Sequence, residues 1–587
     1  MKYTFLLLSC FFIQKLSFSQ DSPNFIFILA DDQGWTGTSV LMDPDNPDSK
    51  SDYYETPNLE RLAASGMRFS SAYAPSPKCS PSRMSIITGQ TTARNHFTNT
   101  SSMVTSGKTL IEPSSSTSIT SDEFTLPEYL KSLTDHNYTT AHFGKWHLGS
   151  DLPEAHGFDE SDGANSNNDG NSGSSINEDP KGIFDITQKG IDFMSEAIAA
   201  DRPFYIRLSH YAVHTDIEST QASFDKYEAK PKGRNHDGAD YAAMTEDLDA
   251  GVGLILDFIE EQQLQGTTYI IYTSDNGGQI NVTSNDPLRL GKTMIFEGGI
   301  RVPLIISGPG ITANSHSSAP VVGYDFYPTI ADLIGGDLSS LPNDLDGTSF
   351  KGILDGTSNE LTKDQPLIFH SPHYENNANK TPRSAIIDGD EKLLVEYETG
   401  DRLHYALNED IDESNNTYSA SSEISTSLLL TLRDYLKSVE AQMPTFSLTE
   451  ADTDEDGLPD SWEFEQLLGT LFDGSDDPDG DGLDNSDEYD QGKDPLVSDA
   501  GIGLLSTSKH TPLKLYPNPV RDFLQVLTDI DGMSLTLYDL GGRLILQQTE
   551  INSTSSVSTV GIPKGVFMYQ IKNQSEEIIA KGRLIKE

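Results

Sequence analysis

Short apolar runs alternate with helical stretches over residues 22 to about 445. The runs at 24–29, 203–208, 268–273 and 303–306 are dominated by Ile, Leu, Phe and Tyr. Between them, residues 241–262 show the periodicity of an amphipathic helix. Strands that are apolar on both faces are typical of a sheet covered by helices on both sides, so we expect an α/β fold in this part of the chain.

Polar stretches divide the rest of the chain. Residues 160–180 are rich in Ser, Asn, Asp and Gly, which is typical of a mobile surface loop, and the Ser- and Thr-rich residues 92–122 could form a rim over a site. Residues 450–499 hold nineteen Asp or Glu and one Lys. Residues 510–587 return to short β-like runs with turn signals. We therefore expect a large α/β part, an acidic segment and a small β module.

The first twenty residues have the composition of a cleaved signal peptide. Lys2 gives a basic start, residues 5–13 are apolar, and small residues precede the expected cleavage site. A lipobox-like run ends at Cys10, but apolar residues follow it, which favours cleavage without lipidation. We assign residues 1–19 to a signal peptide and expect an exported chain.

Charge and length limit the classes of function. The chain has 587 residues, a net charge of −50 and 35% hydrophobic residues, which indicates more than one domain and acidic linkers. The negative charge argues against binding to nucleic acid or to anionic membrane surfaces. Beyond the signal peptide no apolar run is long enough for a membrane span. A polyanionic substrate would therefore need a locally basic site.

One cysteine remains after export. Cys79 would have no partner for a disulfide bond, because Cys10 lies in the signal peptide. A lone exported thiol is either a small buried hydrophobic group or a reactive one. Its neighbours Pro81 and Arg83 favour the reactive group.

Two acidic pairs directly follow apolar runs. Asp31 and Asp32 come after the first run, and Asp275 and Asn276 come after the third. Ligands of open α/β sheets bind beyond the carboxyl ends of strands. Calcium takes about six to eight oxygen ligands, so the two pairs could share one cation. Such pairs also form ordinary turns and helix caps, which is the alternative.

Several polar motifs follow one another along residues 22–440. They are Asp31-Asp32, Cys79-x-Pro81-x-Arg83, Gly144-Lys145-Trp146-His147, Ser209-His210 to His214, Asp275-Asn276, and Lys292 with Glu297 to Arg301. A Lys-x-His pair alone is more often a solvated strand face. Taken together and in this order, the motifs resemble those of the formylglycine-dependent (type I, arylsulfatase-like) sulfatases. Two positions depart from the family pattern: Lys78 replaces a small or apolar residue, and Thr215-Asp216 stands where a proline is common.

The resemblance implies an alkaline-phosphatase-like sandwich. A large mixed sheet flanked by helices would occupy residues 20–365, and a smaller C-terminal α+β subdomain would occupy residues 366–445. The resemblance also implies that a maturation enzyme oxidises Cys79 to formylglycine (3-oxoalanine). The hydrated aldehyde would attack the sulfur of a sulfate ester.

The same resemblance implies the roles of the polar residues. Position 79 would share one calcium ion with Asp31, Asp32, Asp275 and Asn276. The catalytic set would be Cys79, Arg83, Lys145, His147, His214 and Lys292. In it, His214, with Lys292, would protonate the leaving oxygen, and His147 would accept the proton whose loss releases sulfate. His210 would be structural, and Glu297 and Arg301 would form an ion pair.

The acidic segment, expected at residues 446–500, contains two calcium-loop patterns. Each places oxygen ligands at the first, third, fifth, ninth and twelfth positions around a glycine turn. The ligands would be Asp452, Asp454, Asp456, Asp460 and Glu463 in the first loop, and Asp477, Asp479, Asp481, Asn485 and Glu488 in the second. The segment is similar to thrombospondin type 3-like calcium repeats. A solvated acidic linker is the alternative.

Residues 510–587 resemble the C-terminal sorting domains of Bacteroidetes type IX secretion. The resemblance lies in the runs 515–520, 537–543 and 565–571. It implies a small β-sandwich, export through the periplasm to the cell surface or the medium, and a partner in the secretion machinery. The alternative is an ordinary carbohydrate-binding or immunoglobulin-like module.

The sequence thus predicts an exported, calcium-dependent sulfatase that hydrolyses sulfate monoesters. We expect a sulfated carbohydrate as substrate, such as a marine algal polysaccharide or its oligosaccharides, because an exported enzyme meets extracellular polymers. Arg94, His96 and the segments 216–236 and 371–383 are candidates for sugar contacts. A phosphate or phosphonate ester hydrolase of the same fold and an inactive carbohydrate-binding protein are the alternatives.

Overall fold

The structure is a computed structural model. It describes residues 22–586 except 102–107, 109, 364, 375–380, 420–421, 447–451, 453, 470–472, 480, 498–513, 517–522, 528–532, 539–542, 552–555 and 573–577. The expected signal peptide, with Cys10, lies outside the described residues. The chain forms two compact units: the first extends to Leu496 without Gly480–Leu483, and the second contains those residues and the chain from Val497 onward.

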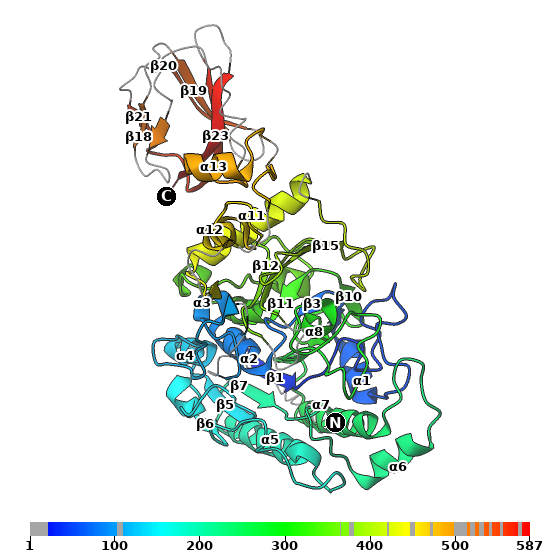
Figure 1. Cartoon of the computed structure of the whole chain (residues 1–587). Helices are drawn as coiled ribbons and strands as arrows, with labels where there is room; N and C mark the ends of the chain where they lie inside the picture. Colours follow the sequence, from blue (N-terminus) through cyan, green and yellow to red (C-terminus); the bar gives the residue numbers. More distant parts are fainter. Residues whose placement is uncertain are drawn as a thin grey trace, which may run out of the picture. The chain divides into compact units, whose positions relative to one another are not determined.

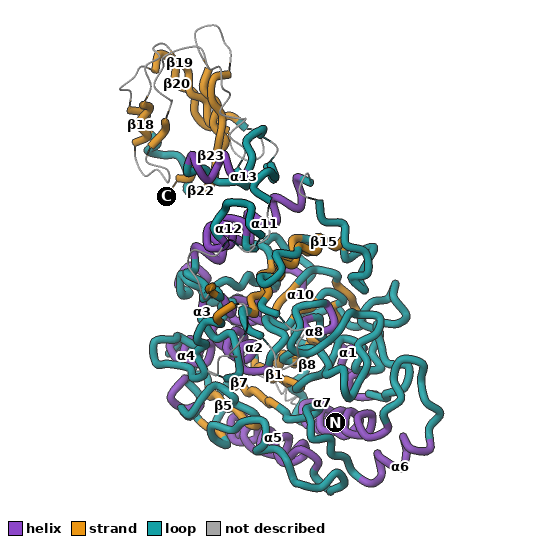
Figure 2. Tube along the Cα trace, in the orientation of Figure 1, coloured by secondary structure: helices purple, strands orange, loops and turns teal. Residues whose placement is uncertain are grey.

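A mixed sheet is the centre of the first unit (Figures 1 and 2). Its described strands follow the order β10-β2-β9-β8-β1-β7-β5-β6. β8, β1, β7 and β5 are parallel neighbours, whereas β9 is antiparallel to both β8 and β2. This arrangement confirms the predicted large mixed sheet. The strands are β1 Asn24–Ala30, β2 Met67–Phe69, β5 Thr139–Gly144, β6 Glu160–Ser161, β7 Phe204–Ser209, β8 Thr268–Ser274, β9 Leu304–Ser307 and β10 Ser315–Ser317.

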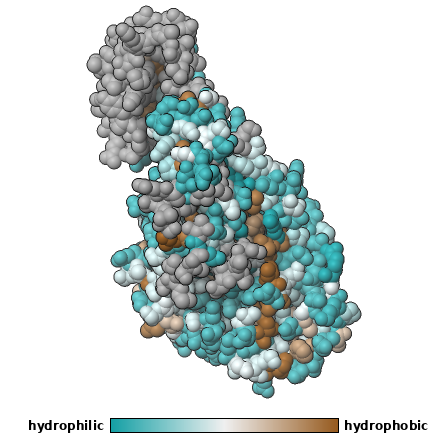
Figure 3. Space-filling view, in the orientation of Figure 1, coloured by the Kyte–Doolittle hydropathy of each residue, from teal (hydrophilic) through white to brown (hydrophobic). Residues whose placement is uncertain are grey.

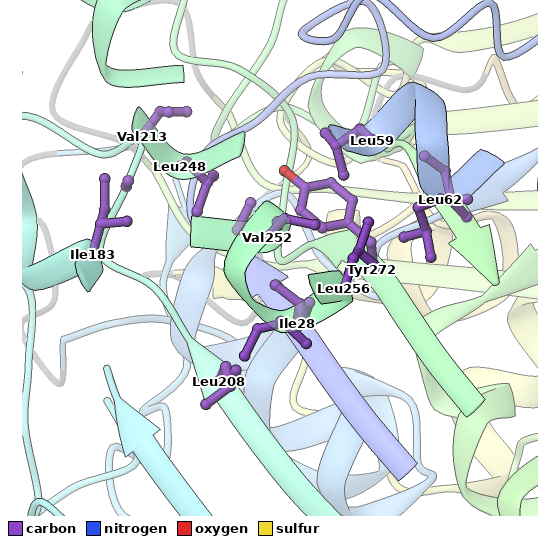
Figure 4. Close-up of a cluster of buried hydrophobic side chains, with 14 of the residues drawn as sticks. Ile28, Leu59, Leu62, Ile183, Leu208, Val213, Leu248, Val252, Leu256 and Tyr272 are labelled. Carbon is purple, nitrogen blue, oxygen red and sulfur yellow. The ribbon is translucent and has the colours of Figure 1, made fainter. Parts of the chain in front are cut away.

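Helices cover both faces of this sheet. Alternate residues of β1 point to opposite sides, so Ile26 and Ile28 join one apolar cluster and Phe25 and Phe27 join another. Figure 4 shows part of the first cluster, in which Leu248, Val252 and Leu256 lie beside Ile28. The first face carries α1 Pro57–Ser65, α5 Ile183–Ala199, α6 Gln221–Ala229 and α7 Ala239–Glu261. The second carries α2 Cys79–Thr88, α4 Leu126–Ser132, α9 Phe326–Leu333 and α10 Lys351–Leu354.

Short elements complete the first unit. They include two small strand pairs and single helical turns, none of which adds to the central sheet. They are β3 Ala72–Tyr73 with β11 Val321–Val322, β4 Leu110–Ile111 with β16 Thr445–Phe446, the helices α3 Thr92–Asn95 and α8 Glu297–Ile300, and the 3-10 turns η1 Pro153–His156, η2 Pro180–Gly182, η3 Gly323–Asp325 and η4 Leu338–Ser340.

A second, antiparallel sheet with one long helix follows, as the α+β subdomain predicts. Leu428 and Leu432 of the helix pack on Ile386 and Leu393 of the sheet. The elements are β12 Leu367–Ser371, β13 Arg383–Asp388, β14 Glu391–Glu396, β15 Arg402–Ala406 and α11 Glu423–Ser438. The boundaries drawn at 365 and 445 stay predictions.

A buried ionic cluster joins this sheet to the end of the central sheet. The Glu297 carboxylate lies 2.7 Å from Arg301 Nε, which confirms the predicted ion pair. Lys392 Nζ lies 2.9 Å from the same carboxylate and 2.8 Å from that of Glu413. Because these groups are buried together, each charge depends on its partners.

The described part of the acidic segment packs on the second sheet and does not form a free linker. It forms α12 (Asp460–Leu467) and α13 (Asn485–Gln491). The ring of Phe464 lies 5.3 Å from that of Tyr397, in the same apolar cluster as α11. The Arg433 guanidinium donates hydrogen bonds of 2.7 and 2.8 Å to the Asp494 carboxylate.

The second unit is rich in strands. Leu524, Leu535 and Ile571 belong to one buried cluster between its sheets, which is the arrangement expected of a small β-sandwich. One sheet holds β17 Lys514–Tyr516, β18 Phe523–Leu527 and β21 Ser556–Ser558. The other holds β20 Leu544–Ile551, β19 Met533–Tyr538, β22 Gly565–Lys572 and β23 Ile578–Lys586. The glycine turn at 541–542 lies outside the described residues.

The surface agrees with the composition. The face drawn in Figure 3 is mostly hydrophilic over the described residues, as a chain with a net charge of −50 requires. Among the described residues, no helix is both long and apolar enough to cross a bilayer.

Candidate active site

The carboxyl ends of four adjacent strands bring the predicted polar residues to one edge of the central sheet. Asp31 follows β1, Asp275 follows β8, and Lys145 follows β5. The loop after β7 begins with His210 and reaches His214. Because these strands are parallel, their loops emerge on the same side, which is where open α/β sheets bind ligands.

Cys79 is the first residue of α2 and lies inside this group of loops. Its side chain is 1% exposed, and its Sγ lies 3.6 Å from Asp31 Oδ1 and 3.8 Å from Asp32 Oδ1. Burial raises the pKa of the Cys79 thiol to about 12, although Lys145 and Lys292 oppose the shift. In this arrangement an unmodified thiol is protonated at neutral pH and is a weak nucleophile.

Three cations lie against three buried carboxylates around Cys79. Arg83, one turn further along α2, donates from Nε to Asp275 at 2.9 Å, and its Nη2 lies 2.7 Å from the same carboxylate. The two lysines each meet one carboxylate: Lys145 Nζ lies 2.5 Å from Asp31, and Lys292 Nζ lies 2.7 Å from Asp32. Burial opposes ionisation of Asp31, but the charges of Lys145, His214 and Arg83 together hold its pKa well below the usual range.

The acidic residues fit a divalent cation. Ligand atoms of Asp31, Asp32, Cys79 and His214 all lie within 4.8 Å of one another. Asn276 donates from Nδ2 to Asp32 Oδ1 at 2.7 Å, while its Oδ1 is buried and has no hydrogen-bond partner. A buried acceptor without a donor is costly, and a hard cation with oxygen ligands would satisfy it.

The two candidate catalytic histidines lie at the entrance. His147 takes a left-handed conformation with φ 58°, donates its N–H to Asn165 O at 2.8 Å, and has a buried Nδ1 without a hydrogen-bond partner. Burial, together with the charges of Lys145 and Arg83, lowers the pKa of His147 to about 2. His214 Nε2 lies 3.7 Å from Asp32 Oδ2. With this pKa, the His147 ring is unprotonated at neutral pH.

His210 has the structural position that the sequence suggested. Its ring is 1% exposed, its N–H donates to Leu29 O at 3.0 Å, and burial lowers its pKa to about 4. The half-buried His147, His214 and Lys292 are the members of the predicted set that reach the surface, because Cys79, Arg83 and Lys145 are buried. A substrate would therefore enter past these three side chains.

Sequence reasoning missed residues that support the site from distant segments. Tyr241 of α7 donates to Asp32 O at 3.2 Å, and Asp162 accepts the Gly144 N–H at 3.0 Å. Neither lies in a recognisable motif, so no local signal could have found them.

Two of the candidate sugar contacts already have partners within the protein. Arg94 pairs with Asp346 at 2.7 Å, and the ring of His96 is held by Glu440 O at 3.1 Å. The candidate segment 371–383 is described only in part.

Comparisons with known proteins agree with this geometry. The sulfatase family model matches residues 23–336, the model "N-sulphoglucosamine sulphohydrolase, C-terminal" matches residues 289–442, and the model "Secretion system C-terminal sorting domain" matches residues 514–586. The sorting domain confirms the predicted resemblance to type IX substrates and indicates export to the cell surface or the medium.

Individual relatives give the same assignment. A sulfatase of Formosa agariphila is 32% identical over 475 residues, which cover 68% of this chain and 85% of that protein. The N-acetylgalactosamine-6-sulfatase of Canis lupus familiaris is 31% identical over 349 residues, which cover 53% of this chain and 62% of that protein. The solved structure of Ps i-CgsB with k-i-k-neocarrahexaose has a TM-score of 0.58 at 24% identity, covers 73% of this chain and 95% of that one, and shows the same fold.

The sequence motifs, the converging side chains and the family match thus point to one chemistry. The chain belongs to the sulfatase family and is a sulfuric ester hydrolase.

Proposed function

We propose that this chain removes sulfate from a sulfated carbohydrate outside the cell, with Cys79 acting in its formylglycine form beside one calcium ion. The observation that carries the proposal is the convergence of Arg83, Lys145 and Lys292 with three buried carboxylates on the head of α2. On a chain with a net charge of −50, this edge of the sheet concentrates positive groups where an anionic ester would need them.

The charged residues would bind and polarise the ester. A sulfate monoester reacts slowly because its oxygens repel nucleophiles and its leaving alkoxide is poor. Lys145 and Lys292 would offset the charge that develops on those oxygens. Asp31, Asp32, Asp275 and Asn276 would hold calcium, which supplies a Lewis acid when bound. Arg83 would orient the residue at position 79.

The two histidines would move the protons. His214 reaches the surface beside Lys292, so it would protonate the leaving oxygen of the sugar. His147 has a buried Nδ1 without a hydrogen-bond partner, so it would accept the proton whose removal releases sulfate from the protein. The oxidised side chain at position 79 supplies the nucleophile, which a protonated thiol could not.

The carbohydrate substrate rests on similarity and export. One similar protein is named for N-acetylgalactosamine 6-sulfate, and one similar structure holds a neocarrahexaose. An exported sulfatase of this kind would meet extracellular polymers, and we propose algal polysaccharides or their oligosaccharides as the class.

A panel of position-defined sulfated sugars tests the proposal. Galactose, fucose and N-acetylhexosamine esters sulfated at single positions would be compared with the matched phosphate esters, and released sulfate or phosphate measured. Preferential release of sulfate from one sugar ester supports the proposal. Faster release of phosphate would make the chain a phosphate ester hydrolase, and turnover of no ester would contradict the function.

Replacing Cys79 should abolish turnover without unfolding the chain. We expect Cys79→Ala to release sulfate no faster than buffer does, because alanine can carry neither an aldehyde nor a metal-binding oxygen. Thermal unfolding should stay close to wild type. Thr88→Ala, at the other end of the same helix, is the matched control. Wild-type sulfate release by Cys79→Ala would refute the nucleophile.

Replacing His147 should separate the two halves of the reaction. His147→Ala should still release the alcohol once per active site but should hold back the sulfate, because the base for the second proton is missing. Rapid-mixing assays of alcohol and inorganic sulfate on the same sample would show the difference. Equal release of both products at the wild-type rate would exclude this role.

We also propose that the acidic segment binds calcium. Carboxylate oxygens of Asp452, Asp454 and Asp456 lie within 4.8 Å of one another, and Asp456 Oδ2 is buried without a hydrogen-bond partner. The predicted ligands Asp460 and Glu463 are 1% and 0% exposed in the first turn of α12. A bound cation would offset the electrostatic repulsion among these carboxylates. In the second loop Asp481 belongs to the other compact unit, so that site stays a prediction from sequence.

Chelation should therefore destabilise the first unit, because α12 packs against α11. Removing calcium should open residues 450–499 to limited proteolysis and lower the unfolding temperature, since an ion at 100 times its Kd contributes about 3 kcal/mol. In the presence of calcium, a double variant Asp454→Asn with Asp456→Asn should behave in the same way. Glu465→Gln, an exposed neighbour on α12, is the control. Unchanged proteolysis in EDTA would count against the site.

A further inference from the structure

A loop rich in Ser, Asn and Gly forms a wall beside the active site. Within the loop 162–182, the carbonyl of Asn165 accepts the backbone N–H of Trp146 at 3.1 Å and that of His147 at 2.8 Å. At Gly170 a Cβ would come within 2.3 Å of the Tyr211 ring, so the backbone packs closely on the loop that carries His214. The composition suggested a mobile loop, but these contacts fasten it to both histidine-bearing segments.

A buried carboxylate holds this wall in place. Glu218, four residues after His214, is 2% exposed. It accepts hydrogen bonds from Ser172 N at 2.7 Å, Asn177 Nδ2 at 3.0 Å and Lys181 N at 3.1 Å. Burial opposes ionisation, but these donors lower the pKa of Glu218, which keeps it charged. Glu218 therefore links the wall to the loop that carries His214.

Three polar side chains run along the wall from the interior to the surface. Lys181 is 0% exposed, and its ammonium donates to Asn171 Oδ1. Asn171 is half-buried, and its Nδ2 lies 3.5 Å from Asp216 Oδ2. Asp216 is exposed and stands two residues after His214. The chain of contacts thus ends beside the group that would protonate the leaving oxygen.

The lysine determines how the amide is oriented. An ammonium group has donors and no acceptor, so the side-chain oxygen of Asn171 must face Lys181. The NH2 group of Asn171 then faces Asp216. The wall presents a fixed donor beside a charged acceptor, a pair that can bind two neighbouring hydroxyl groups.

We propose that Asn171 and Asp216 bind ring hydroxyls of the sugar that carries the sulfate ester, and that Lys181 is a positioning residue that orients Asn171. This inference rests on the proposed function and deepens it, since it assigns recognition of the leaving sugar to the wall. An aryl sulfate has no ring hydroxyls, so its hydrolysis would not use these residues.

The test compares two substrates for each variant. For Asp216→Ala and Asn171→Ala, kcat/KM should fall about 10- to 100-fold with the best sugar sulfate of the panel, as expected for the loss of charge-assisted hydrogen bonds. With 4-methylumbelliferyl sulfate, kcat/KM of each variant should stay within about 2-fold of the wild-type value, because this substrate has no ring hydroxyls for these residues to bind. The same sugar lacking the neighbouring hydroxyl should be hydrolysed equally by wild type and variants.

Lys181 needs variants that separate orientation from folding. Asn171→Asp keeps the size of the side chain and gives Lys181 a charged partner, but it replaces the NH2 donor with an oxygen that repels Asp216. It should lose the sugar preference while its unfolding temperature stays close to wild type. Lys181→Met should raise KM for the sugar sulfate and leave aryl sulfate hydrolysis unchanged. Asp225→Ala, an exposed carboxylate on α6, is the matched control.

The outcomes distinguish this inference from the proposed function. Equal losses on both substrates would make the wall a structural support and overturn the inference, as would unchanged kinetics on the sugar. If the wild-type chain hydrolyses neither ester, the proposed function fails. In that case, the affinities of the wild type and the variants for the sugar sulfate would be measured by calorimetry. The inference is overturned if Asp216→Ala binds the sugar sulfate as tightly as the wild type does.

Discussion

Three buried carboxylates beside three cations at the head of α2 are the constraint on which the rest of this structure depends. Burial of that much charge is unfavourable unless each group has a partner, and Arg83, Lys145 and Lys292 supply one partner per carboxylate. Asp31, Asp32 and Asp275 are also the carboxylates that we propose as ligands of a calcium ion.

The sheet holds these charged groups in place. β8, β1, β7 and β5 are hydrogen-bonded neighbours, both of their faces are covered by helices, and every residue of β1 is buried. Loops that begin at such strands start from fixed positions. The supporting contacts come from elsewhere: Tyr241 reaches Asp32 from α7, and Asp162 caps Gly144 from the loop after β6.

Acidic residues have different tasks in different parts of the chain. At the active site they are buried, paired with cations and close to a reactive position. Glu297 and Glu413 share Lys392 and tie the second sheet to the first. In the segment after residue 450 they gather beside α12, which packs on α11 instead of hanging free. The buried acidic residues at the active site and around Lys392 are thus compensated by cations beside them.

The sequence by itself determined the fold class, the family and nearly all of the candidate catalytic set. The apolar runs and the motifs around Cys79, Lys145 and Lys292 can each be recognised within a short stretch of sequence. Residues at the end of one strand or the start of one helix lie close together in space, so a short motif is enough to identify them. The tertiary structure alone decided which distant groups meet there. Lys181 belongs to a segment with no motif, Arg94 pairs with Asp346, and the loop expected to be mobile is fastened by Glu218. Such contacts depend on how separate loops pack, and no short stretch of sequence encodes that packing.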